Sequence, residues 1–233
     1  MPRITALENA MNAEKNTEMF IGAAAVAAAC ACSEAQRDLY ALGINACAFD
    51  EMERQSAAAL GTRYATRVGT PAAACFLSLM ALTAPALGER AVARGDELIV
   101  VASDRPRGLA EFEQFGVMPI VADVPHPQQI EEWQLEAALS MQTRAVLLSH
   151  TGEEPFDLRT VRNFCNKYDL WLVEDALDAG GASYDFDGTV YRTGTVGDVG
   201  TALLCDGSPA VLTNNETLCA VVQRLRESLR NAE

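Results

Sequence analysis

Short apolar runs alternate with longer amphipathic segments along residues 49–233. The apolar runs lack the strict polar alternation of a sheet that faces water on one side. Apolar strands separated by helices predict a mostly parallel α/β sheet with helices on both faces. We expect strands over residues 97–102, 117–121, 145–149, 170–173, 199–205 and 210–213. We expect helices over residues 49–60, 71–82, 109–115, 128–141, 156–168 and 216–230.

Two local signals fix element ends within this pattern. Thr70 followed by Pro71 is typical of a helix start, with Thr70 as the N-cap and Pro71 in the first turn. Asp206-Gly207-Ser208-Pro209 separates the last two apolar runs, and Asp-Gly is a strong tight-turn signal. The sequence therefore predicts a hairpin, or a very short loop, between residues 199–205 and 210–213.

One segment, residues 170–182, carries the strongest candidate chemistry. An apolar run leads into Glu174 and Asp175, Asp178 follows, and a Gly pair ends the segment. This pattern predicts a buried strand whose carboxyl end presents the three acids at the edge where open α/β sheets bind ligands. A second interpretation is that the acids cap the next turn and face water. The spacing alone leaves both open.

Composition narrows the class of protein. The chain has 233 residues, 49% of them hydrophobic, which suits one folded α/β domain with a small appendage rather than a disordered chain. The formal net charge of −14 argues against a nucleic-acid partner, because affinity for a phosphate backbone comes from clustered Lys and Arg. Lysine occurs only at Lys15 and Lys167.

The seven cysteines are scattered through apolar contexts rather than paired in sequence. A disulfide framework or a zinc site needs tighter spacing. Cys30 and Cys32 are the nearest pair, but on a helix their side chains point apart. We expect reduced thiols, no metal site and a cytoplasmic protein.

Residues 19–32 are apolar and Ala-rich, which superficially suggests a signal peptide. Glu8, Glu14 and Glu18 lie where such a signal needs positive charge, and the run is too short to span a bilayer. Helix is the better prediction because Ala is the strongest helix former. We therefore expect an N-terminal helical segment over residues 1–48 and no membrane anchor.

A set of motifs distributed along residues 49–230 resembles the DegT-type sugar aminotransferase family of pyridoxal-phosphate enzymes. The resemblance is strongest to the CDP-4-keto-6-deoxyglucose-3-dehydrase branch, sugar dehydratases that use pyridoxamine phosphate. It implies the large domain of the aspartate-aminotransferase fold over residues 49–233. The family's small C-terminal domain is missing from this sequence. The motifs are Leu82–Arg90, Gly95–Glu97, Pro119–Asp123, His150–Thr151, Pro155–Leu158, Lys167–Asp175, Gly194–Gly200 and Leu212–Asn215.

The resemblance also implies a cofactor site. In the family, the acid matching Asp175 pairs with the ring nitrogen of the cofactor. In this sequence Asp178 lies three residues after Asp175. Gly69 and Thr70 match part of the phosphate cradle, at a helix N-terminus that suits an anion. A lysine, or a histidine in the dehydratase branch, performs the proton transfer from a loop that here is reduced to residues 206–209.

This sequence departs from that pattern at several positions. No lysine or histidine follows Lys167. Pro71 and Ala73 stand where the family offers a serine and an asparagine, and Pro71 has no N–H to donate. Arg105 replaces the aromatic residue that stacks on the cofactor. The iron–sulfur cysteines of the dehydratase branch have no counterpart.

We therefore expect no catalytic residue, no bound cofactor, and a vestigial site of Gly69, Thr70, Asp175 and Asp178. His150 is the histidine at the ligand edge, and we expect it to be structural; His126 lies between two prolines in a predicted turn. The favoured function is a non-catalytic accessory subunit in deoxysugar biosynthesis, as a homodimer or as a heterodimer with a full-length family member. An active enzyme with a rebuilt pocket, binding a nucleotide sugar, and a gene remnant without activity both remain as alternatives.

Overall fold

The computed structural model describes residues 51–230 except 127, 153–154, 180 and 187. A seven-stranded sheet with the order β1-β9-β8-β5-β4-β2-β3 lies at its centre. Its strands are β1 (Tyr64–Arg67), β2 (Glu97–Ala102), β3 (Met118–Val121), β4 (Thr143–Thr151), β5 (Trp171–Asp178), β8 (Val199–Leu203) and β9 (Pro209–Thr213). β3, β2, β4, β5 and β8 run parallel, while β9 pairs antiparallel with both β8 and β1. This confirms the mostly parallel sheet, with the acid-bearing strand β5 at its middle.

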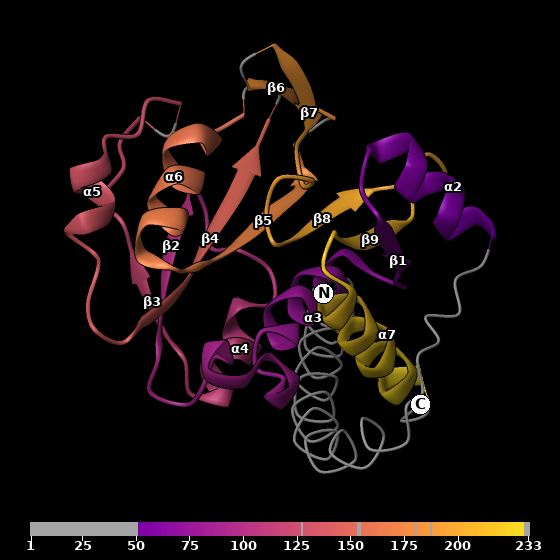
Figure 1. The fold of residues 1–233 in the computed structure, drawn as a ribbon, viewed down its shortest axis with the longest axis horizontal. Helices are drawn as coiled ribbons and strands as arrows, with labels where there is room; N and C mark the ends of the chain where they lie inside the picture. Colours follow the sequence, from indigo (N-terminus) through magenta and orange to yellow (C-terminus); the bar gives the residue numbers. More distant parts are fainter. Residues whose placement is uncertain (1–50, 127, 153–154, 180, 187, 231–233) are drawn as a thin grey trace, which may run out of the picture.

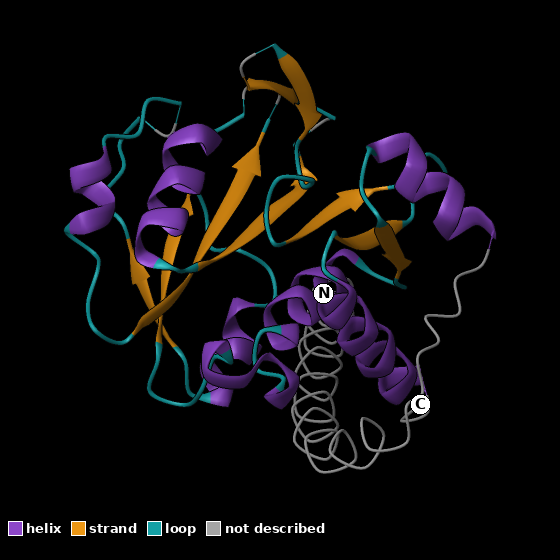
Figure 2. Ribbon diagram, viewed as in Figure 1, coloured by secondary structure: helices purple, strands orange, loops and turns teal. Residues whose placement is uncertain are grey.

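Helices cover both faces of the sheet, as Figures 1 and 2 show. On one face lie α3 (Pro71–Ala81), α4 (Leu109–Phe115) and α7 (Glu216–Arg230). On the other lie α5 (Glu132–Glu136) and α6 (Leu158–Tyr168), with α2 (Glu51–Leu60) beside β1. Successive residues of β2 divide between the faces: Leu98 and Val100 pack with α3 and α4, and Ile99 and Val101 pack with α6. The covering of both faces explains why the strands read as continuous apolar runs.

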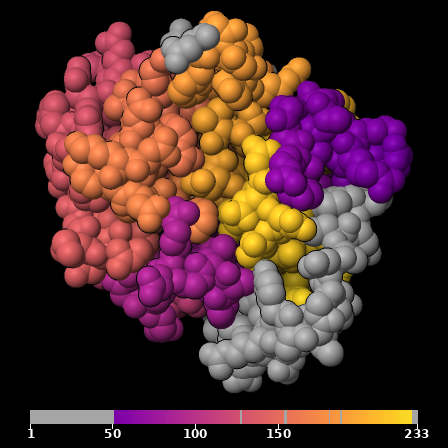
Figure 3. All heavy atoms as spheres, viewed as in Figure 1, coloured from indigo at the N-terminus to yellow at the C-terminus, as the bar shows by residue number. Residues whose placement is uncertain are grey.

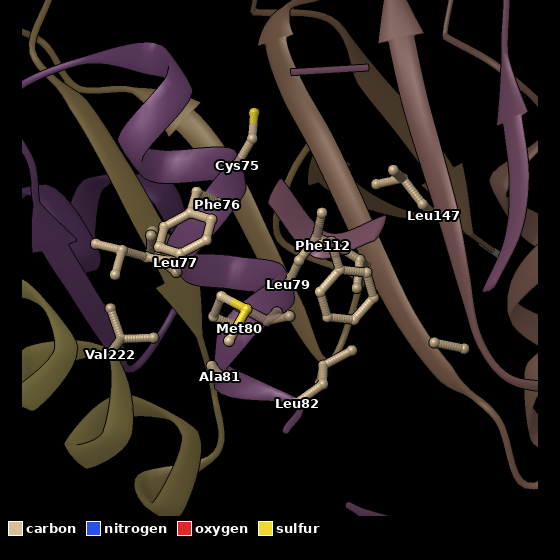
Figure 4. Packing of buried hydrophobic residues seen from close by; sticks show 14 of the residues in the cluster. Cys75, Phe76, Leu77, Leu79, Met80, Ala81, Leu82, Phe112, Leu147 and Val222 are labelled. Atoms are coloured by element: carbon tan, nitrogen blue, oxygen red, sulfur yellow. The ribbon is translucent and has the colours of Figure 1, made fainter. Parts of the chain in front are cut away.

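The helix α3 passes through the interior of the domain. All residues from Ala74 to Ala81 are buried, and Figure 4 shows the labelled apolar side chains of this helix between Leu147 of β4 and Val222 of α7. The helix begins as predicted: the Thr70 hydroxyl accepts a hydrogen bond from the Ala73 N–H at 3.1 Å, and Pro71 occupies the first turn.

Three further elements have no counterpart in the sequence prediction. β1 is a four-residue edge strand, and the 3₁₀ helix Pro85–Arg90 follows α3. The hairpin of β6 (Ser183–Phe186) and β7 (Thr189–Arg192) forms a separate two-stranded sheet. β6 alternates exposed and half-buried residues and β7 is exposed throughout, so neither has an apolar run to reveal it.

The predicted helix over residues 128–141 is wrong in extent, because α5 covers only Glu132–Glu136. Glu131 is its N-cap, in a reciprocal capping box with Gln134, so the helix cannot extend toward residue 128. Past its end, the N–H groups of Ala138 and Leu139 bond carbonyls three residues back rather than four. The amphipathic pattern was correct, and the caps shorten the helix.

The strands around the site also differ in length from the prediction. β5 continues beyond Val173 through all three acids to Asp178, because β4 and β8 pair with it there. β8 ends at Leu203, two residues early. The predicted hairpin between β8 and β9 is confirmed: the Leu204 N–H donates to the Ser208 carbonyl at 2.8 Å across the Asp206-Gly207 turn.

A buried ion pair fastens α2 to the rest of the domain. Glu53 is 2% exposed and accepts hydrogen bonds from the Arg67 N–H at 2.8 Å and from Nη1 of Arg226 at 2.6 Å. In Figure 3 the yellow C-terminal segment accordingly lies directly beside the indigo α2–β1 segment. Removing one partner of a buried ion pair leaves an uncompensated charge and costs about 3–5 kcal/mol, so this contact fixes the packing of α2.

The predicted N-terminal helical segment, residues 1–48, lies outside the described residues, as do Cys30, Cys32 and Cys47. Among the described residues, Cys75, Cys165 and Cys205 are free thiols, and Cys219 is a buried cysteine on α7. In the same part of the chain, none of the helices has the length and apolar character needed to cross a membrane.

Candidate functional site

The acids of β5 reach the carboxyl edge of the sheet as predicted, but they separate there. Glu174 is completely buried and faces the α6 side of the sheet. Asp175 is 5% exposed and faces α3 on the opposite side. Asp178, the last residue of β5, is exposed. Adjacent strand residues point to opposite faces, so the first two acids belong to different environments.

Glu174 is the centre of a structural network. Its carboxylate accepts hydrogen bonds from the backbone N–H groups of Gly194 at 2.6 Å, Val196 at 3.0 Å and Gly197 at 3.0 Å. Nε2 of His150 lies 3.2 Å away. A carboxylate with this many donors stabilises a fixed loop, so Glu174 holds residues 194–197 against β5.

His150, at the end of β4, is 1% exposed and joins this network. The Phe156 N–H donates to its Nδ1 at 3.2 Å, so that nitrogen is an acceptor and Nε2 carries the proton toward Glu174. The Tyr184 hydroxyl lies 2.8 Å from Nε2 and connects the β6–β7 hairpin to the sheet. Burial raises the pKa of Tyr184, and the Glu174 charge raises it further. His150 is thus buried and hydrogen-bonded, as expected for a structural residue.

Asp175 is held by the chain's own hydroxyl groups. Oδ1 accepts from Oγ1 of Thr201 at 2.7 Å, and Oδ2 accepts from Oγ of Ser149 at 3.3 Å. The thiol of Cys75, in the second turn of α3, neighbours the same carboxylate. Burial raises the pKa of that thiol, and the Asp175 charge raises it further. A protonated, buried thiol is a poor nucleophile, so this cluster offers packing and hydrogen bonding rather than covalent chemistry.

Arg107 bridges the edge of the sheet beside Asp175. Its Nη1 donates to Oδ2 of Asp178 at 2.6 Å and its Nη2 to Oδ1 at 3.3 Å, a two-pronged ion pair between the β2–α4 connection and the end of β5. The hydrogen bond to Asp178 raises the pKa of Arg107, and the charge of Asp175 contributes in the same direction. Arg107 was missed at the sequence level, although it lies two positions after Arg105.

The other predicted positions contribute less. Gly69 and Thr70 are exposed at the N-terminus of α3, and the Thr70 hydroxyl already caps that helix. Arg105 stands at the position of the family's stacking aromatic residue. Its guanidinium forms an ion pair with Glu113 of α4. In the described part of the chain, no group of three or more His, Cys, Asp or Glu side chains could hold a metal ion.

Comparison with known proteins identifies the family. Residues 36–226 match the DegT/DnrJ/EryC1/StrS aminotransferase family. The chain belongs to this family. It is 33% identical over 186 residues to the lipopolysaccharide biosynthesis protein RfbH of Salmonella typhimurium, covering 76% of this chain and 42% of that protein. It is 32% identical to the dTDP-4-dehydro-2,6-dideoxy-D-glucose 3-dehydratase of Saccharopolyspora spinosa, covering 75% and 39%. The chain thus spans about two fifths of the length of these relatives.

The fold agrees with solved structures of the same class. A GDP-4-keto-6-deoxymannose-3-dehydratase with a trapped pyridoxal phosphate–glutamate geminal diamine superposes with a TM-score of 0.63 at 22% identity. The match covers 74% of this chain and 45% of that one. It supports the aspartate-aminotransferase-like fold of the described domain. Relatives of this family act on nucleotide sugars as aminotransferases and dehydratases.

The residues around Asp175 do not fit a covalently held pyridoxal phosphate. Such a cofactor needs a lysine, and Lys167 lies on α6, with its Nζ hydrogen-bonded to Glu132 at 2.7 Å and Glu136 at 3.0 Å. The turn at residues 206–208 carries no lysine or histidine. Both carboxylate oxygens of Asp175 already have hydrogen-bond donors within the chain.

Proposed function

We propose that this protein is a catalytically degenerate member of its family that works by binding. It serves as an accessory subunit in the biosynthesis of nucleotide-linked deoxysugars, such as those of lipopolysaccharide or of glycosylated metabolites, and acts in the cytoplasm. Neither pyridoxal phosphate nor pyridoxamine phosphate is bound in its resting state. Gly69, Thr70, Asp175 and Asp178 are the vestige of the cofactor site.

The observation that carries this proposal is the tight turn between β8 and β9. Leu204 and Ser208 are joined by a backbone hydrogen bond, and Asp206 caps the turn by accepting from the Ser208 N–H at 2.9 Å. A turn of this size cannot extend a lysine or histidine toward Asp175, which lies one strand away on β5. The lack of any lysine or histidine after Lys167 agrees with this.

The alternative of an active enzyme with a rebuilt pocket has less support. Such an enzyme needs a nucleophile and a base within hydrogen-bond reach of each other. Cys75 is a buried thiol with a raised pKa, and His150 has its ring nitrogens engaged by Phe156, Tyr184 and Glu174.

Assembly is part of the proposal. We place a pyridoxal-phosphate-transferase-like domain at residues 49–233, preceded by a helical segment over residues 1–48. This chain forms a homodimer when it is alone and a heterodimer with a full-length family member when one is present. A nucleotide sugar is the ligand that the heterodimer would handle. The partner's complete active site would then supply the chemistry.

The first test asks whether the chain can form a Schiff base with pyridoxal phosphate. We expect no borohydride-reducible adduct at any residue of the described site, because no lysine lies there. Reduction followed by peptide mass mapping makes the measurement, and an adduct at Lys15 or at exposed Lys167 does not count, because neither residue belongs to the described site. Labelling of a residue near Asp175 would refute the degenerate site.

The second test concerns the partner. The tagged chain is co-expressed with a full-length family member of the native host, and the two are expected to copurify in a fixed ratio. The matched control is the same tagged chain with a full-length fold-type-I aminotransferase from outside this family. Equal capture of both proteins, or of neither, would contradict the accessory role.

A further inference from the structure

A surface cavity of about 280 Å³ lies at the amino edge of the sheet, where β4 and β5 begin. The three acids of β5 lie at the opposite, carboxyl edge. Sites for drug-sized ligands measure about 300–1,000 Å³, so this cavity suits a small metabolite and has no room for a whole nucleotide sugar. Its lining includes two basic and two acidic side chains, Arg90, Arg144, Glu89 and Asp169.

Arg90, at the end of the 3₁₀ helix, is fixed by two contacts with Trp171 of β5. Its guanidinium lies 3.7 Å from the centre of the indole ring, and its backbone carbonyl accepts a hydrogen bond from Nε1 of Trp171 at 2.7 Å. Neither contact uses a guanidinium N–H group. Among the described residues, Nη2 forms an ion pair with Oδ1 of Asp169 at 3.4 Å, and Nε has no hydrogen-bond partner. The guanidinium is therefore positioned by the fold without being saturated by it.

Arg144 is fixed in a similar way at the start of β4. Its Nη1 donates to the backbone carbonyls of Met141 and Thr143, each at 3.2 Å. Its Nε lies 3.8 Å from Oδ1 of Asp96, which is too far for a hydrogen bond. Because carbonyl oxygens carry no net charge, much of the positive charge of Arg144 remains available to an anion. Two positioned guanidinium groups in one cavity are well suited to a phosphoryl group.

Asp169 provides an independent observation. It is the C-cap of α6 with φ 53° and ψ 44°, and no other non-glycine residue in the described part of the chain has a positive φ. Such a position usually holds glycine, and a negative charge at the C-terminus of a helix is unfavourable as well. The exposed ion pair with Arg90 offsets little of this. Strained non-glycine residues are typical of ligand sites, and a carboxylate there can accept hydrogen bonds from hydroxyl groups.

We propose that this cavity binds the phosphate ester of a single sugar ring. Arg90 and Arg144 bind the phosphoryl group, while Asp169 and Glu89 accept hydrogen bonds from the ring hydroxyls. The two acids make the site selective, because they repel a bare anion and gain hydrogen bonds only from a ligand that carries hydroxyl groups. The site lies at the opposite edge of the sheet from Asp175, so it does not depend on the proposed accessory function.

Glucose 1-phosphate is the probe, titrated into the full chain by isothermal titration calorimetry at constant ionic strength. We expect saturable binding that is about tenfold weaker in Arg90→Gln and in Arg144→Gln, because each loses charge-assisted hydrogen bonds to the phosphoryl group. Arg144→Gln leaves the contact between Arg90 and Trp171 in place, so the test does not depend on that packing. Arg105→Gln, which removes an exposed arginine outside the cavity, is the matched control and should bind like wild type.

Two smaller probes separate the parts of the ligand. Inorganic phosphate and glucose, titrated separately, should each bind at least about tenfold more weakly than the ester, because each lacks one set of contacts. Inorganic phosphate that binds as tightly as the ester would overturn the assignment of a sugar ester. Wild type without saturable binding of the ester, or with the same affinity as both cavity variants, would overturn the site itself.

Asp169→Gly separates binding from structure. Glycine adopts a positive φ without a steric penalty, so the thermal unfolding midpoint should not fall. The affinity for glucose 1-phosphate should fall about tenfold, because a charged acceptor for the hydroxyls is lost. The affinity for inorganic phosphate should not fall, since a negative charge has left the cavity. A lower midpoint with unchanged affinity for the ester would make Asp169 a structural residue and overturn its role in binding.

Discussion

Two adjacent acids in one strand have different tasks in this protein. Glu174 has four donors around its carboxylate and fixes the loop at residues 194–197. Asp175 has hydroxyl donors and a buried thiol beside it. The difference arises because the strand turns one side chain to each face of the sheet. The residue with the tightest network is therefore not the one that matches the family's cofactor acid.

Glu174→Gln is expected to lower the free energy of unfolding by about 2–4 kcal/mol. In the wild-type protein N–H donors face both carboxylate oxygens, and in the variant one of these oxygens is replaced by an NH₂ group, which cannot accept their hydrogen bonds. Urea denaturation followed by circular dichroism measures the change. Glu227→Gln, an exposed position on α7, is the control and should shift stability by less than about 0.5 kcal/mol. Equal effects at both positions would mean that the Glu174 network contributes nothing.

At the scale of elements, the β8–β9 hairpin depends on one glycine. Gly207 has φ 80°, and a Cβ atom added there would have no neighbour within 4 Å, so a side chain meets backbone strain and no clash. Gly207→Ala should destabilise the protein by about 1–2 kcal/mol. Gly69→Ala is the matched control, because Gly69 is equally open and has no positive φ. Thermal unfolding of the two variants should therefore differ, and identical midpoints would refute the strain argument.

The same turn gives a pH prediction. Hydrogen bonds from the Ser208 hydroxyl and backbone N–H hold the pKa of Asp206 below its usual value. A carboxyl whose pKa is lower in the folded state stabilises the fold above its unfolded pKa, and that contribution is lost as the pH falls through the folded pKa. Asp206→Asn should therefore be less stable than wild type at neutral pH, and the two curves should converge in acid. A constant difference across the pH range would contradict this assignment.

At the scale of the whole molecule, apolar side chains remain on the outside of the domain. Val121 is 72% exposed, Trp133 65%, Met141 85% and Val190 70%. Exposed apolar area costs on the order of 25 cal/mol for each Å², which favours association where such residues are covered together. We therefore expect a dimer by sedimentation velocity at micromolar concentration. A monomer that also gains no mass when a full-length family member is added would remove the accessory-subunit proposal.

The sequence by itself determined the class of the fold and the edge that carries the acids. Continuous apolar runs separated by amphipathic segments require a sheet buried on both faces, and local signals such as Thr70-Pro71 and Asp206-Gly207 act within a few residues. The departures from the family pattern at Pro71 and at residues 206–209 could also be read from the sequence, because one is a single substitution and the other a local shortening.

Only the tertiary structure decided which groups meet at that edge. The division of Glu174 from Asp175 depends on which helix covers each face, and Arg107 reaches Asp178 across 71 positions of sequence through the packing of Gly108 on α3. The short length of α5 likewise depends on its capping box. The β6–β7 hairpin is joined to the sheet by the hydrogen bond between Tyr184 and His150. Contacts between residues distant in sequence carry no local signal, so these features could be read only from the folded chain.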